Sequence, residues 1–150
     1  RNKKKIETED IVKLTNLSEN ISFNDLVDNA LARNQKKTLY ILNENNFVPE
    51  DSILILRIFI NKLKRLLRIQ SEIKIKKNLD EVILNFKPPI FWKDKNIVKK
   101  QIGIWSREKI LNLIFKTNDI ELIIKKNPST STNIITDFIL EQAGDLNSEP

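Results

Sequence analysis

The sequence contains no cysteine, no histidine and no methionine, and its only two glycines are Gly103 and Gly144. Without cysteine the chain has no disulfide framework, which favours a cytoplasmic location. Without cysteine and histidine it also lacks the usual zinc ligands and the commonest general base. Two distant glycines cannot build a glycine-rich phosphate loop. We therefore expect no metal site, no bound cofactor and no catalytic site, and in particular no nucleotide hydrolysis.

Long apolar runs are also missing. The most apolar stretch, Ile53 to Ile60, is interrupted by Arg57 and followed by Lys62. A membrane span needs about 20 predominantly apolar residues, so no membrane role is expected. The sequence shows no signal-peptide pattern. Because it begins at Arg1 and contains no methionine, we expect it to be a piece of a longer protein.

Positive charge is in excess, with 26 Lys and Arg against 20 Asp and Glu and a net charge of +6. Such a balance is compatible with a polyanionic partner. The alternative is that lysine, asparagine and isoleucine are abundant together because an AT-rich genome encodes them, without selection for binding. Clusters of lysine are therefore more informative than the total charge.

The stretch from Val48 to Lys77 predicts the central helix of the molecule. Proline and two carboxylates at its start, Pro49 to Asp51, suit a first helical turn. The run Ile53 to Ile60 predicts burial on every side, and the apolar stripe beyond it is expected to leave the basic residues on the other faces. That stripe comprises Leu56, Ile60, Leu63, Leu67 and Ile73, and the basic residues are Lys62, Lys64, Arg65 and Arg68. A strand is the rejected alternative, because no turn residue interrupts the chain before Asn78.

Capped amphipathic segments fill the rest of the chain. They predict helices over residues 9–14, 22–34, 36–45, 79–85, 90–104, 107–126 and 133–143, with caps at Thr8, Ser22, Asn78, Ser106 and Thr132. Leu122 is placed in the inward stripe of the 107–126 helix, and Trp105 is interpreted as a packing anchor. No segment alternates with period two. The sequence therefore predicts an all-α helical bundle of about seven to eight helices.

Several phrases of the sequence follow one another in an order that resembles a known family. They are IETEDIV (Ile6 to Val12), FNDLVDNALA (Phe23 to Ala32), KKTLYILN (Lys36 to Asn43), PEDSILILR (Pro49 to Arg57), PPIFWK (Pro88 to Lys93) and QIGIWS (Gln101 to Ser106). Their order and spacing resemble the C-terminal region, the end of the lid plus the collar, of the delta subunit of the bacterial DNA polymerase III clamp loader.

This resemblance implies three parts in the chain. Residues 1–20 would be the end of an ATPase-like lid domain and a linker, residues 21–143 the helical collar domain, and residues 144–150 a polar tail. In that family collar domains join five subunits into a ring. The implied partners are the delta-prime and the gamma or tau subunits, and primer–template DNA indirectly or weakly. The sliding clamp would be reached only through an N-terminal module that this sequence does not include.

The resemblance also directs attention to two surfaces. A basic surface with an aromatic is expected where the template strand passes the collar, and the best match is Phe91, Trp92, Lys93, Lys95 and Lys99. Lysines neutralise phosphates and an aromatic face stacks on an unpaired base. Phe115 and Ile123 are the candidates for a subunit interface. The alternative at both places is plain structure, with the rings buried and the lysines a solvated coating.

The implied function is a non-catalytic subunit fragment of the DNA polymerase III holoenzyme, a DNA-directed nucleotidyltransferase, that assembles the loader ring during replication. The alternative is a stand-alone basic helical domain that binds nucleic acid or another protein. An enzyme is the weakest hypothesis. Asp25 and Asp28 lie one turn apart, but such pairs are usually solvated helix caps, and no histidine, cysteine or glycine-rich loop accompanies them.

Overall fold

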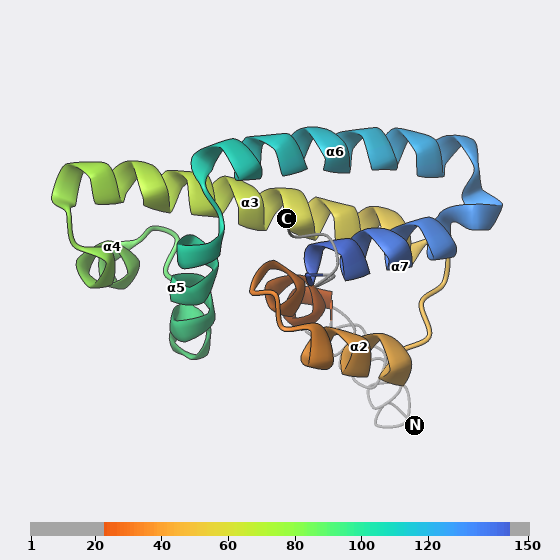
Figure 1. Ribbon diagram of the computed structural model, residues 1–150, viewed down its shortest axis with the longest axis horizontal. Helices are drawn as coiled ribbons and strands as arrows, with labels where there is room; N and C mark the ends of the chain where they lie inside the picture. Colours follow the sequence, from red (N-terminus) through yellow and green to blue (C-terminus); the bar gives the residue numbers. More distant parts are fainter. Residues whose placement is uncertain (1–22, 145–150) are drawn as a thin grey trace, which may run out of the picture.

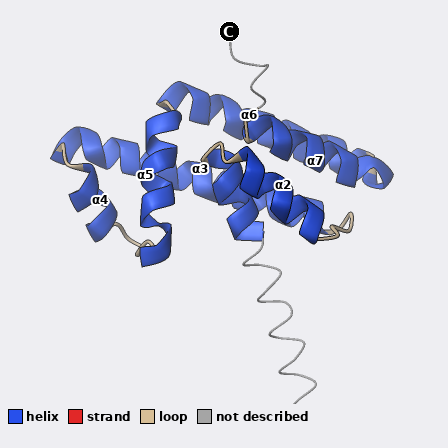
Figure 2. Ribbon diagram, turned by 60° about the horizontal axis from the view of Figure 1, so that its bottom comes forward, coloured by secondary structure: helices blue, strands red, loops and turns tan. Residues whose placement is uncertain are grey.

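The computed structural model describes residues 23–144, and within that range the predicted all-α fold is confirmed, with seven α-helices and no β-strand (Figures 1 and 2). The first helix is the segment 23–31. The others are α2 (Gln35–Glu44), α3 (Asp51–Lys76), α4 (Leu79–Asn85), α5 (Lys95–Ile104), α6 (Arg107–Lys126) and α7 (Ser131–Gln142). The proposed boundary near residue 20, the helix over 9–14 and the caps at Thr8 and Ser22 lie outside the described residues.

The two longest helices, α3 and α6, run side by side along the long axis of the molecule (Figure 1). Helix α3 also contacts α4, α5 and α7. Helix α6 otherwise contacts α7 and the short 3-10 turn Pro128–Thr130 that joins α6 to α7. Helix α7 in turn covers α2. The central position predicted for the 48–77 stretch is therefore confirmed.

The buried face of α3 differs from the predicted stripe. Its buried side chains recur every three or four residues, as a helix half covered by neighbours requires, and they include Ile55, Phe59, Leu63, Leu66 and Ile69. Three members of the predicted stripe, Ile60, Leu67 and Ile73, are only half-buried. Leu54 is exposed, so burial on every side of Ile53 to Ile60 was wrong. Neighbouring helices cover α3 on several sides but leave a gap over Leu54.

Local capping chemistry sets several helix ends. The side chains of Asn78 and Ser106 accept hydrogen bonds from the backbone N–H groups of Glu81 and Lys109, both at 3.2 Å, as predicted. Two predicted starts were wrong. A 3-10 turn, Trp92–Asp94, precedes α5, and α7 begins at Ser131 rather than after a Thr132 cap.

A buried ion pair joins three helices. The Lys62 Nζ atom lies 3.0 Å from both carboxylate oxygens of Asp28. Gln101 Nε2 donates to the Asp28 carbonyl at 2.9 Å and to its Oδ1 at 3.3 Å. All three residues are buried. The expectations that Lys62 is on a solvated face and Asp28 is a solvated cap were therefore wrong, because α3 directs Lys62 towards the segment 23–31, where each charge finds its partner.

Trp105 confirms the prediction of a packing anchor. The side chain is buried, and its Nε1–H donates to the Leu31 carbonyl at 2.6 Å. Gln70 of α3 donates through Nε2 to the Trp105 carbonyl, also at 2.6 Å. The short connection between α5 and α6 is thus fixed to both the segment 23–31 and α3.

Candidate nucleic-acid and subunit interfaces

The connection from α4 to α5 is held against α3 at two points. Phe86 and Ile90 are buried. Arg68 of α3 donates through Nη2 to the Lys87 carbonyl at 2.8 Å, and its guanidinium lies 4.6 Å from the centre of the Phe86 ring. A loop anchored by apolar burial and by a charged donor has a defined path. The fold therefore determines the positions of the loop's exposed side chains.

Two aromatic side chains stand out from this loop. Phe91 is 57% exposed and Trp92 is 69% exposed, with ring centres 5.9 Å apart and planes inclined at 52°. Lys93 places its Nζ atom 5.4 Å from the centre of the Trp92 ring. We call Phe91, Trp92 and Lys93 the aromatic–lysine loop. Its exposure meets the condition that stacking on an unpaired base requires, and the alternative of buried rings is wrong.

The two other lysines of the predicted DNA surface are placed differently. Lys95 is half-buried at the start of α5. Lys99, one turn further along α5, forms an ion pair with Asp80 of α4. The structure thus brings Phe91, Trp92 and Lys93 together, while Lys99 already has an acidic partner within the bundle.

Asp94, directly after the aromatic–lysine loop, has a perturbed carboxyl group. Burial raises its pKa above the ordinary value, and the Asp28 carboxylate adds to the rise. The cations of Lys62 and Arg65 act in the opposite direction, and Asp25 contributes a further small rise. The end of the loop therefore lies within the electrostatic reach of the buried ion pair.

The outer side of α6 carries the second candidate surface. Phe115 is 69% exposed, Leu122 is 57% exposed and Ile123 is 47% exposed. Phe115 and Leu122 are two turns apart on one side of the helix with the exposed Asn118 and Asp119 between them, and Ile123 lies about a quarter turn around the helix. We call these three residues the α6 apolar face. Sequence reasoning had named Phe115 and Ile123 but placed Leu122 inward, which was wrong. The seven-residue spacing from Phe115 was the signal that could have found it.

The described range contains neither a metal-binding cluster nor a membrane-spanning helix. Residues 23–144 contain no group of three or more acidic, histidine or cysteine side chains placed to hold a metal ion. No helix in that range is long and apolar enough to cross a membrane. The two surfaces above, one aromatic and basic and one apolar, are suited to binding.

Comparisons with family models, curated proteins and solved structures find no match to this chain. The resemblance described from the sequence therefore stays a prediction. The functional proposal depends on that resemblance together with the side chains and exposures given above.

Proposed function

We propose that this chain is a non-catalytic helical module of a DNA polymerase III clamp loader, corresponding to the collar region of a delta-like subunit. Its task would be to hold the loader ring together while the sliding clamp is placed on DNA. The partners would be the delta-prime and the gamma or tau subunits, with the cytoplasm as the location. The chain would itself supply no catalytic group.

The observation that carries this proposal is the α6 apolar face. Packing within residues 23–144 leaves Phe115, Leu122 and Ile123 largely uncovered. Scattered exposed apolar residues are normal on any protein, whereas a group on one helix face is typical of an interaction site. A collar subunit needs such a face, because its neighbours in a mixed ring are different chains rather than copies of itself.

The test is assembly with purified delta-prime and gamma or tau subunits, followed by size-exclusion chromatography with light scattering. The wild-type chain is expected to be monomeric alone and to enter the heteromeric complex. The double variant Phe115→Ser with Ile123→Ser should lose that binding, because burial of the apolar face drives association.

A matched control is Leu84→Ser on α4. Leu84 is 68% exposed, much like Phe115, but it lies on another helix. This variant should assemble like the wild type. A stable homo-oligomer at micromolar concentration, with no affinity for the partner subunits, would contradict the proposal.

A second candidate function, a stand-alone nucleic-acid-binding domain, is favoured by the aromatic–lysine loop. In this case the isolated chain would bind single-stranded or primer–template DNA without partner subunits. Trp92→Ala should weaken binding roughly five- to 150-fold, the range that loss of one stacked base predicts. Lys93→Ala with Lys95→Ala should lower the salt dependence of the affinity.

Tyr40→Ala is the matched control for the aromatic change. Tyr40 is 59% exposed on α2, away from the aromatic–lysine loop, so its removal should leave DNA affinity unchanged. Affinity and salt dependence that stay at wild-type values in both the Trp92 and the lysine variants would exclude this loop as a DNA contact. Fluorescence anisotropy with a labelled oligonucleotide measures both quantities.

A further inference from the structure

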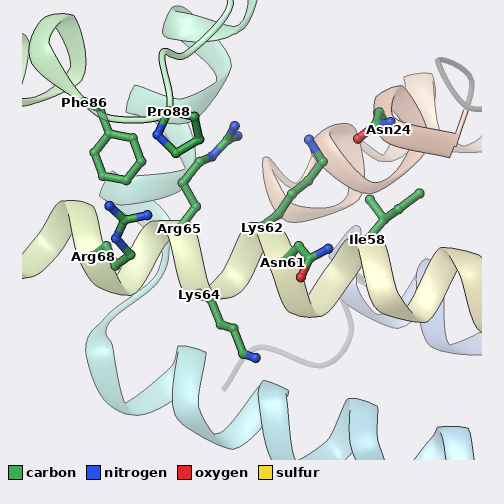
Figure 3. Close-up of a pocket in the computed structure, with 9 residues that line it drawn as sticks. All are labelled: Asn24, Ile58, Asn61, Lys62, Lys64, Arg65, Arg68, Phe86 and Pro88. Atoms are coloured by element: carbon green, nitrogen blue, oxygen red, sulfur yellow. The ribbon is translucent and has the colours of Figure 1, made fainter.

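A basic pocket of about 560 Å³ opens between α3, the start of the segment 23–31 and the chain that follows α4 (Figure 3). Its lining includes four cations and two apolar residues: Lys62, Lys64, Arg65, Arg68, Phe86 and Pro88. Its volume falls within the range of about 300–1,000 Å³ that small-ligand sites occupy. The sequence had indicated basic residues on α3 but gave no sign that they line a pocket.

The charges around the pocket do not balance. Among residues 23–144, four cationic side chains and no carboxylate line it, while Asp28 and Asp25 lie close enough to Asp94 to act on its carboxyl group. Asp28 is engaged with Lys62 at 3.0 Å. Burial raises the pKa of Asp94 although Lys62 and Arg65 oppose the rise, and Asp94 forms no ion pair within the described part of the chain. Within the described residues, positive charge is therefore in excess along the lining of the pocket.

Arg65 is the cation of the pocket whose buried donor atoms lack hydrogen-bond partners. Its Nε and Nη2 atoms are covered by protein but have no hydrogen-bond acceptor among residues 23–144. A charged donor that is buried without an acceptor is costly. Figure 3 shows Arg65 and Lys62 rising from the same side of α3, with Arg65 beside Pro88 and Lys62 directed towards the segment that carries Asn24. An anion placed between them would offset the charge of Arg65 and could accept a hydrogen bond from its Nη1 atom, which is not enclosed.

We propose that this pocket binds the phosphate of a nucleotide, carried either by the end of a nucleic-acid strand or by a free nucleoside monophosphate. Arg65 would donate to a phosphate oxygen through Nη1, the guanidinium nitrogen that the protein does not enclose, in a charge-assisted hydrogen bond. Lys62 would add charge from the pocket floor while it keeps its bond to Asp28. The binding is an equilibrium without a covalent step.

The rest of the lining explains why the ligand would carry more than a phosphate. Pro88 contributes exposed apolar surface beside the cations, whereas the Phe86 ring is buried beneath the Arg68 guanidinium. The Arg68 guanidinium is already stacked over the Phe86 ring at 4.6 Å, and planar guanidinium groups also stack on bases. The exposed Pro88 ring and the Arg68 guanidinium, which line the same pocket as Arg65, offer surfaces that suit a sugar and base attached to the phosphate.

This inference does not depend on loader assembly or on the aromatic–lysine loop. The isolated chain would bind the ligand even if it never joined a ring. Trp92→Ala would weaken contact with the body of a strand, whereas loss of Arg65 would remove the preference for a terminal phosphate. The two proposals can therefore fail separately.

The experiment is isothermal titration calorimetry of the 150-residue chain with four probes. They are inorganic phosphate, deoxyadenosine monophosphate, an oligonucleotide with a terminal phosphate, and the same oligonucleotide with a terminal hydroxyl. The terminal phosphate should strengthen oligonucleotide binding about tenfold, as a charge-assisted hydrogen bond predicts. The monophosphate should bind more tightly than inorganic phosphate. Oligonucleotide affinity above that of the monophosphate would identify the strand end as the source, and the reverse would identify the free nucleotide.

Three variants test the residues. Arg65→Gln should abolish the effect of the terminal phosphate, whereas Lys74→Gln, which removes an exposed charge from the last turn of α3, should retain it. Asp94→Asn removes a carboxylate beside the pocket and should tighten binding, so the proposal stays testable even if Arg65→Gln fails to fold. Equal affinity for phosphate and hydroxyl ends, or an Arg65→Gln chain that binds like Lys74→Gln, would overturn the proposal. Inorganic phosphate binding as tightly as the monophosphate would overturn the nucleoside part.

Discussion

Helices α3 and α6 lie side by side but depart from the usual distribution of side chains in opposite ways. Helix α3 buries a lysine, Lys62, and α6 exposes a phenylalanine, Phe115. The cause is the number of neighbours, since α3 is also covered by α4 and α5, which do not cover α6. Burial on each helix is thus decided by what surrounds it rather than by its own composition.

The same comparison separates structural from functional candidates. Lys62 is explained within the molecule, because Asp28 pairs with it and Gln101 supports Asp28. Phe115 has no comparable explanation, since residues 23–144 leave 69% of it exposed. An unusual residue with an internal partner is explained by the fold, whereas an exposed group such as the α6 apolar face is a candidate for an interaction site.

The largest expected contrast comes from removing a phenylalanine from each helix. Phe59 of α3 is fully buried and packs edge-on against Phe138 of α7, with ring centres 5.1 Å apart. Phe59→Ala should lower the free energy of unfolding by about 3–5 kcal/mol. Phe115→Ala on α6 should change it by less than about 0.5 kcal/mol, because the ring is already in solvent.

Urea unfolding followed by circular dichroism measures both values. A large loss of stability from Phe115→Ala would mean that the α6 apolar face contributes to the fold. It would then no longer be a candidate interface.

The next contrast concerns two lysine–carboxylate pairs. Lys62→Ala should cost about 3 kcal/mol, because the Asp28 carboxylate would be left buried without its cation. Lys116 of α6 pairs with Glu141 of α7 at 2.6 Å, but both side chains are about half exposed. Lys116→Ala should therefore cost less than about 1 kcal/mol.

Thermal or urea unfolding of the two variants at one pH measures the two losses of stability. Comparable losses from the two substitutions would show that solvent reaches the Lys62–Asp28 pair. In that case the ion pair would contribute little to the packing of α3 against the segment 23–31.

The helices could be predicted from the sequence because their signals are local. Caps such as Asn78 and Ser106 bond to backbone groups three residues away, so composition and spacing suffice to find them. The face of α3 that is buried could not be predicted as well, because it depends on where α4, α5 and α7 cross it. Lys62 illustrates the limit, since its partner Asp28 is 34 residues distant in the sequence.

In the candidate sites, too, local features could be predicted from the sequence and features that depend on tertiary packing could not. Phe91 and Trp92 could be singled out because they follow two prolines and adjoin lysines, but their exposure depends on how Arg68 anchors the preceding chain. The basic pocket was not foreseen, because it forms only when residues after α4 fold back on the middle of α3. Charge along one helix does not reveal what faces it.

A smaller contrast compares the two tryptophans. Trp105→Phe keeps most of the apolar volume but removes the Nε1–H that donates to the Leu31 carbonyl at 2.6 Å. Leaving that carbonyl without a donor should cost about 1–3 kcal/mol. Trp92→Phe, at the exposed loop, should change stability by less than about 0.5 kcal/mol. Equal effects in unfolding experiments would show that the Trp105 Nε1–H hydrogen bond contributes little to fixing the start of α6 on the segment 23–31.

The smallest expected effect is that of Asp94, the carboxyl group that faces α3. Burial, aided by Asp28, raises its folded-state pKa above the ordinary value of 3.8, although Lys62 and Arg65 oppose the rise. A carboxyl with a raised folded pKa binds protons more strongly in the folded than in the unfolded state. Its ionisation therefore lowers the stability of the fold as the pH rises from the ordinary pKa through the folded one.

Asp94→Asn should consequently stabilise the chain at about pH 7, by less than about 1 kcal/mol because solvent still reaches the side chain. The advantage should shrink as the pH falls and should vanish below the ordinary pKa, where Asp94 is neutral in both states. Unfolding in urea at several pH values measures this difference, with Asp119→Asn on the exposed side of α6 as the control, expected to stay within about 0.5 kcal/mol of wild type throughout. A variant that is instead less stable at neutral pH would show that attraction to Lys62 and Arg65 outweighs the burial of Asp94. The excess positive charge assigned to the basic pocket would then be smaller than proposed.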